Sequence, residues 1–302
     1  MPSRTLVTGV DGFTGRYLAP LLKDHGHEVH GLVTRTCHEA APWDAHVGDL
    51  VDATRVHQIV RSVAPDFVVH LAGVSFVAHG DAESVYRTNL IGTRHLLEAL
   101  ASLPRRPAAV LLASSANVYG NSTKGVISED TPPDPANDYA VSKLAMEYLS
   151  HLYANRLPII IARPFNYTGV GQSETFLLPK IVAHTRRRAR FIELGNIEVA
   201  RDFSDVRMVV EAYRRLISTP AAIGGTYNIC SGRAFTLHEV LAMVEEVSMH
   251  RMEVRVNRTL ARTNEVRVLL GTRDRLESVV GALPLYKLKD TLRWMFEASA
   301  PS

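Results

Sequence analysis

Cysteine is scarce in this sequence, whose 302 residues include only Cys37 and Cys230. Two thiols cannot build a disulfide framework or a cysteine-based zinc knuckle, so both are expected as buried thiols in a reducing compartment. The chain also lacks any run of about 18 apolar residues, which argues against a membrane span. Its first residues enter an apolar strand by Thr5 without the charged and apolar regions of a signal peptide. We therefore expect a cytoplasmic protein.

Neither sign of charge dominates. The chain has 34 Lys and Arg residues against 31 Asp and Glu residues, for a net charge of +3. That balance argues against a nucleic-acid-binding or membrane-surface protein. Even the most basic run, residues 186–190, is interpreted as a solvated face. The length and the 46% hydrophobic content suit one large or two small globular domains.

Histidine is plentiful, with 13 residues, yet we predict no metal site. The segment His27-Glu28-Val29-His30 resembles a zinc-binding motif only superficially, because its spacing is not that of the H-E-x-x-H helix. On a strand, His27 and His30 would point to opposite faces.

The start of the chain has the pattern of a nucleotide-binding βαβ unit. Residues 5–8 form a short apolar strand, a helix pattern follows, and residues 28–33 form a second strand. The turn between the first strand and the helix reads G-x-x-G-x-x-G, which lets the backbone and the helix N-terminus approach a pyrophosphate. The residues predicted to contact the pyrophosphate are Gly9, Gly12, Phe13, Thr14 and Gly15.

The segment after the second strand decides which dinucleotide is expected. An acidic side chain there would bind the adenosine ribose of NAD. The sequence has Thr34-Arg35-Thr36 instead, and Arg35 suits a 2′-phosphate, so NADP(H) is favoured and NAD(H) remains the alternative. Arg35 as a solvated loop residue is the competing interpretation. Asp49, before Leu50, either accepts from the adenine amino group or caps the next helix.

Further apolar strands are expected over residues 66–71, 108–113 and 158–162, alternating with helical patterns. This alternation predicts an α/β fold with a doubly wound parallel sheet. Ligands of such sheets bind beyond the carboxyl ends of the strands. The segment Leu71-Ala72-Gly73 falls there, and its small residues allow a ribose or phosphate to approach the backbone. Asn89, in a helix expected over about residues 81–100, either bridges strand ends or satisfies local backbone.

The predicted reaction centre comprises Ser115, Tyr139 and Lys143. Ser115 follows an apolar strand, and Tyr139 and Lys143 are four residues apart, so on a helix they share one face. A neighbouring ammonium is expected to lower the pKa of the tyrosine and to let it exchange a proton with a substrate oxygen. Ser115 would hold the same oxygen. With ten Tyr and six Lys in 302 residues, chance alone gives roughly 0.2 such pairs. The interpretation therefore depends on the serine at the end of the preceding strand and on the nucleotide-binding pattern at the start of the chain.

Beyond residue 164 the alternation changes, and we expect no further βαβ repeat. Helices are expected over residues 176–188, after Asp205 as N-cap, from Thr236, and near residues 288–296. A strand is expected over residues 227–230.

These motifs together resemble the extended short-chain dehydrogenase/reductase family. The resemblance rests on Thr8-Gly9 to Gly15, Leu71 to Gly73, Ser114-Ser115 to Gly120, Tyr139 to Lys143, and Arg163 to Asn166. It implies a Rossmann domain at residues 1–164, joined by a return segment near 201–232, and a smaller C-terminal α/β substrate lobe within 165–302. It also implies that Ser115, Tyr139 and Lys143 are catalytic. The implied cofactor contacts are Gly9, Gly12, Phe13, Thr14, Gly15, Arg35, Asp49, Leu50, Leu71, Ala72, Gly73, Asn89, Tyr139, Lys143 and Pro164.

Within that family the chain is most similar to the GDP-6-deoxy-D-mannose reductases. The similarity implies that Arg201 and Arg262 hold a diphosphate, with Asn166 and Lys180 helping, and that Ser75 faces the hexose. Arginine suits this task because its fork matches phosphate oxygens, although each Arg taken alone is equally a surface ion pair. The full set of implied substrate contacts is Ser75, Ser115, Asn117, Asn166, Lys180, Arg201, Arg262 and Glu265.

One departure from relatives is informative. Sugar 4,6-dehydratases of this family carry acidic residues between the catalytic Ser or Thr and the Tyr-Gly pair, where this chain has Ala116 and Asn117. Neither residue can abstract a C5 proton. The sequence therefore argues against a 4,6-dehydratase.

Our interpretation is an NADPH-dependent reductase of a nucleotide-linked 4-keto-6-deoxyhexose, most similar to enzymes that form GDP-6-deoxy-D-mannose. The first alternative is a nucleotide-sugar C4 epimerase with tightly bound NAD. The second is a non-catalytic NADP(H)-binding regulator, against which the intact Ser115, Tyr139 and Lys143 speak. The resemblance also implies a homodimer through the helices that contain Asn89 and Tyr139.

Overall fold

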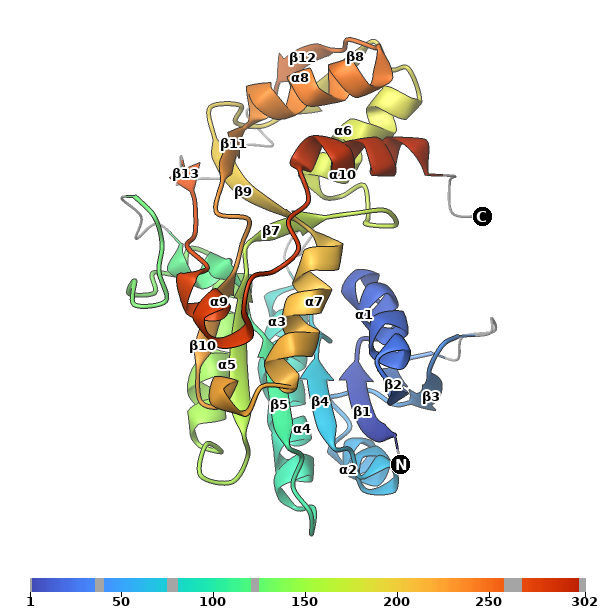
Figure 1. The fold of residues 1–302 in the computed structure, drawn as a ribbon, viewed down its shortest axis with the longest axis vertical. Helices are drawn as coiled ribbons and strands as arrows, with labels where there is room; N and C mark the ends of the chain where they lie inside the picture. The colour runs from blue at the N-terminus through green and yellow to red at the C-terminus, as the bar shows by residue number, and fades with distance from the viewer. Residues whose placement is uncertain (1, 36–40, 75–80, 121–124, 258–267, 299–302) are drawn as a thin grey trace.

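The computed structural model describes residues 2–35, 41–74, 81–120, 125–257 and 268–298. Seven of its strands form one parallel sheet: β1 (Ser3–Thr8), β2 (His27–Val33), β3 (Asp44–Val47), β4 (Phe67–His70), β5 (Ala109–Ala113), β6 (Ile159–Pro164) and β10 (Thr226–Ile229). Their order is β10-β6-β5-β4-β1-β2-β3 (Figure 1). The predicted α/β fold with a doubly wound parallel sheet is confirmed.

Helices cover both faces of this sheet because neighbouring residues of each strand point to opposite sides. On β1, for example, Val7 packs into one core and Leu6 into the other. The first core is closed by α1 (Phe13–Asp24), α7 (Val206–Ile217) and α9 (Asp274–Val280). The second is closed by α2 (Ala53–Val63), α4 (Thr93–Ala101) and α5 (Asp138–His151).

The strand order reverses next to β1, whose neighbours are β2 on one side and β4 on the other. In open α/β sheets the ligand crevice lies at this switch point, beyond the carboxyl ends of the strands. The turns after β1, β4, β5 and β6 therefore meet at the edge where the sequence predicts the site.

The helix expected over residues 81–100 is interrupted. It begins as α3 (Ala82–Tyr86), passes through a π-helical segment at Arg87–Gly92, and continues as α4. The hydroxyl of Thr93 donates to the carbonyl of Asn89 at 2.6 Å within this stretch. Such side-chain bonds accompany local departures from α-helical geometry, and π segments are frequent at functional sites.

The expectation that no βαβ repeat follows residue 164 was wrong. Helix α7 packs on the sheet, and β10 then pairs in parallel with β6 as a seventh strand. The repeat is hard to find in the sequence because a long excursion into a second group of elements separates β6 from α7.

That second group lies above the carboxyl edge of the central sheet (Figure 1). Four of its strands form one sheet: β7 (Asn166–Thr168), β9 (Ala200–Asp205), β11 (Ala234–Thr236) and β13 (Val268–Leu269). A separate parallel pair consists of β8 (Phe191–Leu194) and β12 (Glu253–Val256). The group is covered by α6 (Leu177–Arg186), α8 (Leu237–Ser248) and α10 (Leu288–Glu297), which share one apolar core.

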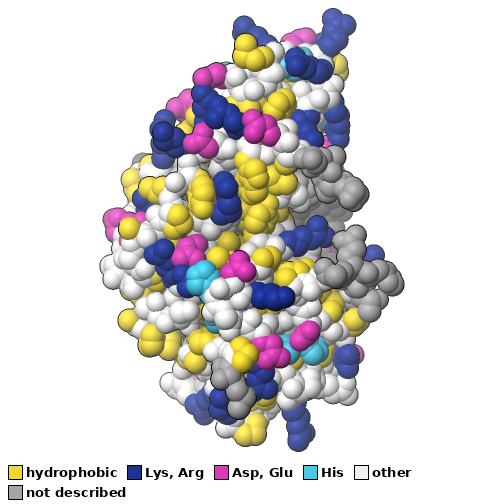
Figure 2. Space-filling model, turned by 45° about the vertical axis from the view of Figure 1, so that its right-hand side comes forward, with side chains coloured by type: hydrophobic (Ala, Val, Ile, Leu, Met, Phe, Trp, Pro, Cys, Tyr) yellow, Lys and Arg dark blue, Asp and Glu magenta, His cyan; other side chains and the backbone are white. Residues whose placement is uncertain are grey.

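The surface agrees with the balanced charge of the sequence. On the face shown in Figure 2, basic and acidic side chains are interspersed and do not gather into a single stripe. Among the described residues, no helix combines the length and apolar character needed to cross a membrane.

Candidate active site

The glycine-rich turn after β1 forms a cradle of bare backbone. Gly9 has φ +67°, and a Cβ on it would lie 2.9 Å from both Cα and N of Ala72, so only glycine fits there. A Cβ on Gly15 would lie 2.3 Å from the carbonyl oxygen of Val10. Gly12 is the N-cap of α1, and it contributes no side-chain cap. This arrangement fits a dinucleotide pyrophosphate, which needs close backbone approach and N–H donors.

The residues expected at the adenosine end occupy the same sheet edge. Arg35 is exposed and comes two residues after β2. Asp49 is also exposed, and its Oδ1 accepts from the amide of Val51 at 3.0 Å. The N-cap of α2 is Asp52, not Asp49. Leu50 is buried in the core beneath them.

The three predicted catalytic residues converge. Asn137 caps α5 and thereby starts the helix just before Tyr139. Tyr139 is half-buried and shares a side-chain hydrogen bond with Ser115. Lys143 is buried one turn further along α5, and its Nζ donates to the carbonyl oxygen of Ala113 at 2.8 Å. A Cβ on Gly73 would lie 3.2 Å from that Nζ, so the loop after β4 closes against the same ammonium.

The expected lowering of the tyrosine pKa was wrong. Burial raises the pKa of Tyr139 to about 12, and the hydrogen bond with Ser115 opposes that rise only in part. Burial also lowers the pKa of Lys143 to about 8, against the opposing effect of Glu147. Desolvation is therefore the largest cause of both shifts, and at Lys143 it outweighs the charge of Glu147. At neutral pH the phenol is protonated, and it is a proton donor rather than a base.

Asn89 connects the loop after β4 to α5, the helix of Tyr139 and Lys143. Its Oδ1 accepts from the amide of Val74 at 2.8 Å, and its Nδ2 donates to the carbonyl of Val74 at 3.2 Å. The same Nδ2 donates to Ser142 Oγ at 3.0 Å, and Ser142 donates to the carbonyl of Tyr139 at 2.7 Å. Asn89 thus joins the loop after β4 to a helix rather than two strand ends, and it also satisfies the backbone of Val74.

Buried His70 continues this network. Thr93 uses its hydroxyl proton on the Asn89 carbonyl, so it can only accept from His70 Nε2, 2.9 Å away. His70 Nδ1 must then accept from the Thr8 hydroxyl at 2.7 Å, and Thr8 in turn accepts from the amide of Ala72 at 3.2 Å. Burial lowers the pKa of His70 to about 3. A neutral imidazole of defined tautomer thus links Thr8 of β1, and through it the amide of Ala72 after β4, to Thr93 of α4.

A buried ion pair supports the other side of Lys143. Glu147, one turn beyond Lys143, accepts from Arg163 Nε at 2.9 Å and from its Nη2 at 2.5 Å. The hydroxyl of Ser114 donates to the same carboxylate. Arg163 also donates to the Tyr119 hydroxyl at 2.9 Å. This cluster fixes the end of β5, from which Ser115 follows.

The predicted substrate contacts are less closely grouped. Asn117 donates through its backbone and its side chain to Ser115 Oγ, at 3.1 and 3.0 Å. Asn166 and Arg201 lie on the paired strands β7 and β9, and Asn166 donates to the carbonyl of Asp202 at 3.3 Å. Lys180, on α6, donates to the carbonyl of Glu193 at 2.7 Å, which directs it to the small β8–β12 pair.

Four predicted positions, Cys37, Ser75, Arg262 and Glu265, lie outside the described residues. Pro164 ends β6 at the sheet edge. Phe13 and Thr14 both contact Tyr167, three residues further on. The rings of Phe13 and Tyr167 stack with their centroids 6.0 Å apart, and the hydroxyls of Thr14 and Tyr167 lie 2.8 Å apart.

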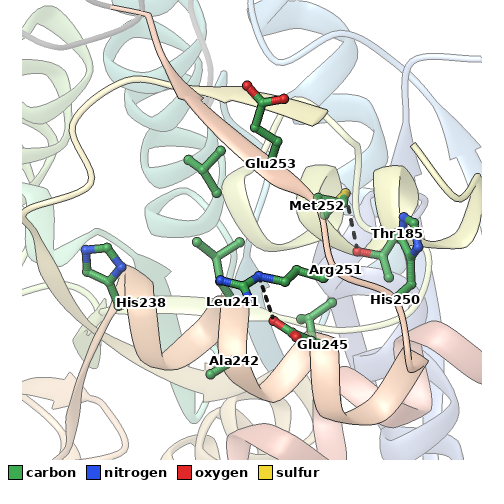
Figure 3. Close-up of a pocket in the computed structure, with 11 residues that line it drawn as sticks. Thr185, His238, Leu241, Ala242, Glu245, His250, Arg251, Met252 and Glu253 are labelled. Carbon is green, nitrogen blue, oxygen red and sulfur yellow. Dashed lines mark hydrogen bonds and ion pairs between the residues drawn. The ribbon is translucent and has the colours of Figure 1, made fainter. Parts of the chain in front are cut away.

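A cavity of about 680 Å³ lies elsewhere, between α8 and β12. Figure 3 shows its lining, in which Arg251 pairs with Glu245 at 3.9 Å and Thr185 contacts the sulfur of Met252. Its elements α8 and β12 lie far from α5, the helix that carries Tyr139 (Figure 1).

Three parts of this network were not predicted from the sequence: His70, Ser142 and the pair of Glu147 with Arg163. Glu147 follows Lys143 by the same four-residue spacing that links Lys143 to Tyr139, so helix periodicity alone places it on that face. His70 and Ser142 carried no such signal, because their partners come from distant segments.

Ser115, Tyr139 and Lys143 thus converge beside a glycine-rich cradle that fits a dinucleotide, and comparison with known proteins identifies the family. The model of the GDP-mannose 4,6 dehydratase family matches residues 6–295. The chain belongs to this family of extended short-chain dehydrogenases/reductases, and is a nucleotide-sugar-modifying, NAD(P)-dependent enzyme.

Two characterised relatives are similar over nearly the whole chain. The chain is 34% identical to GDP-6-deoxy-D-talose 4-dehydrogenase from Aggregatibacter actinomycetemcomitans over 279 residues, covering 92% of this chain and 91% of that protein. It is 32% identical to GDP-6-deoxy-D-mannose reductase from Pseudomonas aeruginosa over 308 residues, covering 97% and 96%.

Two solved structures share the fold. One is a putative epimerase from Burkholderia cenocepacia, with a TM-score of 0.92 and 51% identity, covering 98% of this chain and 97% of that one. The other is RMD from Pseudomonas aeruginosa complexed with NADPH, with a TM-score of 0.83 and 32% identity, covering 98% and 97%.

Proposed function

We propose that this protein reduces the C4 ketone of a nucleotide-linked 4-keto-6-deoxyhexose, and that the substrate is GDP-4-keto-6-deoxy-D-mannose and the product GDP-6-deoxy-D-mannose (GDP-D-rhamnose). The observation that carries the proposal is the convergence of Ser115, Tyr139 and Lys143 beside the loop after β4. The names of both characterised relatives describe redox chemistry on GDP-linked 6-deoxyhexoses.

Protonation of the site supports the reductive direction. Tyr139, with a pKa of about 12, would donate its proton to the sugar O4. Ser115, held by Asn117, would orient the carbonyl. Lys143 would supply positive charge next to the reacting oxygen. Bound nicotinamide supplies the hydride, and these side chains position and polarise the ketone.

NADP(H) is the proposed cofactor, with NAD(H) as the alternative. Arg35 stands exposed after β2, where an acidic residue would mark an NAD site. RMD from Pseudomonas aeruginosa was solved with NADPH, whereas the more distant MoeE5, 28% identical, was solved with NAD. A ratio of kcat/KM values for NADPH and NADH, measured with Arg35→Ala beside wild type, would test the proposed phosphate contact.

Dehydratase chemistry is not proposed despite the name of the family. Ala116 is buried and has no ionisable group, and Asn117 is engaged with Ser115 Oγ. No carboxylate stands at either position, so abstraction of a C5 proton lacks a base there.

The deciding experiment is NADPH consumption with GDP-4-keto-6-deoxy-D-mannose, beside dTDP- and CDP-linked ketosugars and an NADH control. We expect consumption with the GDP-sugar that is lost in Tyr139→Phe and retained in Tyr148→Phe, an exposed tyrosine of the same helix. Absence of consumption with every ketosugar would refute the proposal. NMR of the product would distinguish the 6-deoxymannose from its C4 epimer, the 6-deoxytalose named for the Aggregatibacter relative.

A second candidate is a nucleotide-sugar C4 epimerase, because the Burkholderia structure, 51% identical, is described as a putative epimerase. Such an enzyme oxidises the sugar and then reduces it again, so it retains its NAD. Copurified NAD, interconversion of nucleotide-hexoses and no net NADPH consumption would favour this candidate over the reductase.

We also propose a homodimer through α5 and the adjoining π-helical segment. Val141 and Tyr148 of α5 are 38% and 62% exposed, and Leu152, the C-cap of that helix, is 76% exposed. Ile91 of the π segment is 40% exposed. Apolar side chains exposed in this way mark contact surfaces. Sedimentation of Leu152→Glu should show a monomer, whereas Leu285→Glu, at an exposed site elsewhere, should sediment as wild type.

A further inference from the structure

Two histidines and two carboxylates gather on the outer strands of the central sheet, away from its carboxyl edge. The parallel register places His30 of β2 opposite Asp44 of β3, and His46 follows Asp44 by two residues. Glu28 precedes His30 by two residues. Because alternate residues share a face, all four side chains lie on one face of the sheet.

Their donor atoms are close together. His30 Nδ1 lies 3.1 Å from His46 Nε2 and 4.0 Å from Asp44 Oδ2. His30 Nε2 lies 3.2 Å from Glu28 Oε1. One donor atom from each of Glu28, His30 and Asp44 falls within 4.8 Å of the others. The ring of His30 is 8% exposed, and its Nε2 makes no hydrogen bond within the described part of the chain.

We propose that this cluster binds one divalent transition-metal ion of the Zn²⁺, Co²⁺ or Ni²⁺ type. His30 Nδ1, His46 Nε2 and the Asp44 carboxylate are the ligands. The Glu28 Oε1 lies 3.2 Å from His30 Nε2 without a hydrogen bond, and its half-exposed side chain would turn to accept the Nε2–H when the ion binds. Imidazole and carboxylate together suit these ions rather than Mg²⁺ or Ca²⁺. A carboxylate behind a ligating histidine is the usual arrangement that fixes the ring and its tautomer.

The geometry supports chelation by the two rings. Two ring nitrogens that face each other share at most one proton, whereas a cation accepts both lone pairs. With metal–nitrogen bonds of roughly 2.1 Å, the 3.1 Å separation of His30 Nδ1 and His46 Nε2 corresponds to an angle of about 95° at the ion. The side chain of Asp44 is 72% exposed, so it is free to close its longer distance and leaves room for water ligands.

This proposal departs from the expectation of no metal site, and the reason is structural. His27, the other histidine of the local motif, turns to the opposite face, where its Nδ1 lies 2.7 Å from Thr5 Oγ1. The partners of His30 come from β3, whose register against β2 cannot be read from the sequence. The ion would bind the short edge strand β3 to β2 and would have no part in the reduction.

The test is a titration of the chelator-treated full-length chain with Zn²⁺ and Co²⁺. Binding is measured by calorimetry for both ions and by the visible absorption of bound Co²⁺. We expect one ion per chain and a raised melting temperature. His46→Ala and Asp44→Asn should weaken binding by at least tenfold, and Glu28→Gln by roughly 10–100-fold. The matched control is His238→Ala, since His238 is an exposed histidine 3.7 Å from the carboxylate of Glu198. It should bind as wild type.

Thermal unfolding of each variant, measured in the presence of chelator, identifies the variants that remain folded. Metal affinities are compared only among these variants. Absence of saturable binding of one ion per wild-type chain would overturn the proposal. So would affinity unchanged in both His46→Ala and Asp44→Asn, because the ions would then be held by scattered surface histidines.

Discussion

Replacement of Glu147 by Gln should destabilise the protein by several kcal/mol. Glu147 and Arg163 have side chains only 6% and 8% exposed, and two hydrogen bonds of 2.9 and 2.5 Å join them. Removing one charge of a buried pair leaves the other without compensation, which costs about 3–5 kcal/mol. The bond from Arg163 to the Tyr119 hydroxyl remains, so we expect about 3 kcal/mol, at the lower end of that range.

Urea denaturation measures this loss as a lower midpoint at unchanged slope. The control is the double variant Glu147→Leu with Arg163→Met, which removes both charges and should cost less than Glu147→Gln alone. A loss below about 1 kcal/mol for Glu147→Gln would refute the reasoning, since exposed pairs contribute that little.

The same variant should alter the pH profile of the reaction. Glu147 opposes the burial that lowers the pKa of Lys143 to about 8. In Glu147→Gln the pKa of Lys143 should fall further, so that activity is lost at a lower pH on the alkaline side. A profile identical to wild type would limit Glu147 to a structural role.

Three further outcomes are expected. Gly9→Ala should weaken NADPH binding at least tenfold, because its Cβ would lie 2.9 Å from the Ala72 backbone and a residue with φ +67° carries roughly 1–2 kcal/mol of strain. A wild-type affinity in a fluorescence titration would contradict the role of this glycine turn in binding the cofactor. His70→Phe should cost about 1–3 kcal/mol in chemical denaturation by removing the partner of the Thr8 hydroxyl, and an unchanged midpoint would argue against the network. Between pH 8 and 10 the wild type should gain stability relative to Lys143→Met, because the pKa of Lys143 is about 8 when folded and near 10.5 when unfolded, so the unfolded chain binds more protons there. A pH-independent difference in melting temperature between the two would contradict this.

The central sheet was predictable because its signal is local. Each buried strand is a short apolar run, and each helix has its own periodicity, so alternation of the two identifies the fold without any tertiary information. The seventh strand was expected over residues 227–230, but its place in a further βαβ repeat was not, since β10 pairs with β6 only after a long intervening segment. The π-helical segment at Asn89 depends on side-chain hydrogen bonds that no local sequence pattern predicts.

Within the site, spacing predicted proximity but not protonation. A spacing of four positions from Tyr139 to Lys143 places both on one helix face, whatever surrounds them. The pKa of Tyr139 depends mainly on its burial, with smaller effects from the hydrogen bond with Ser115 and from the charge of Tyr167, both in other segments of the chain. The direction of a pKa shift therefore needs the packed structure, while the identity of the acid does not.

The path of the chain between its two groups of strands limits how the protein can be recombined. The backbone passes from β6 into β7, returns from β9 into α7, and leaves again from β10 into β11. A chimera joined once, at residue 164, would take α7 and β10 from the donor and so would exchange part of the first core, on the face of the sheet opposite α5. Transfer of substrate specificity between relatives therefore requires several junctions, placed where these strands end.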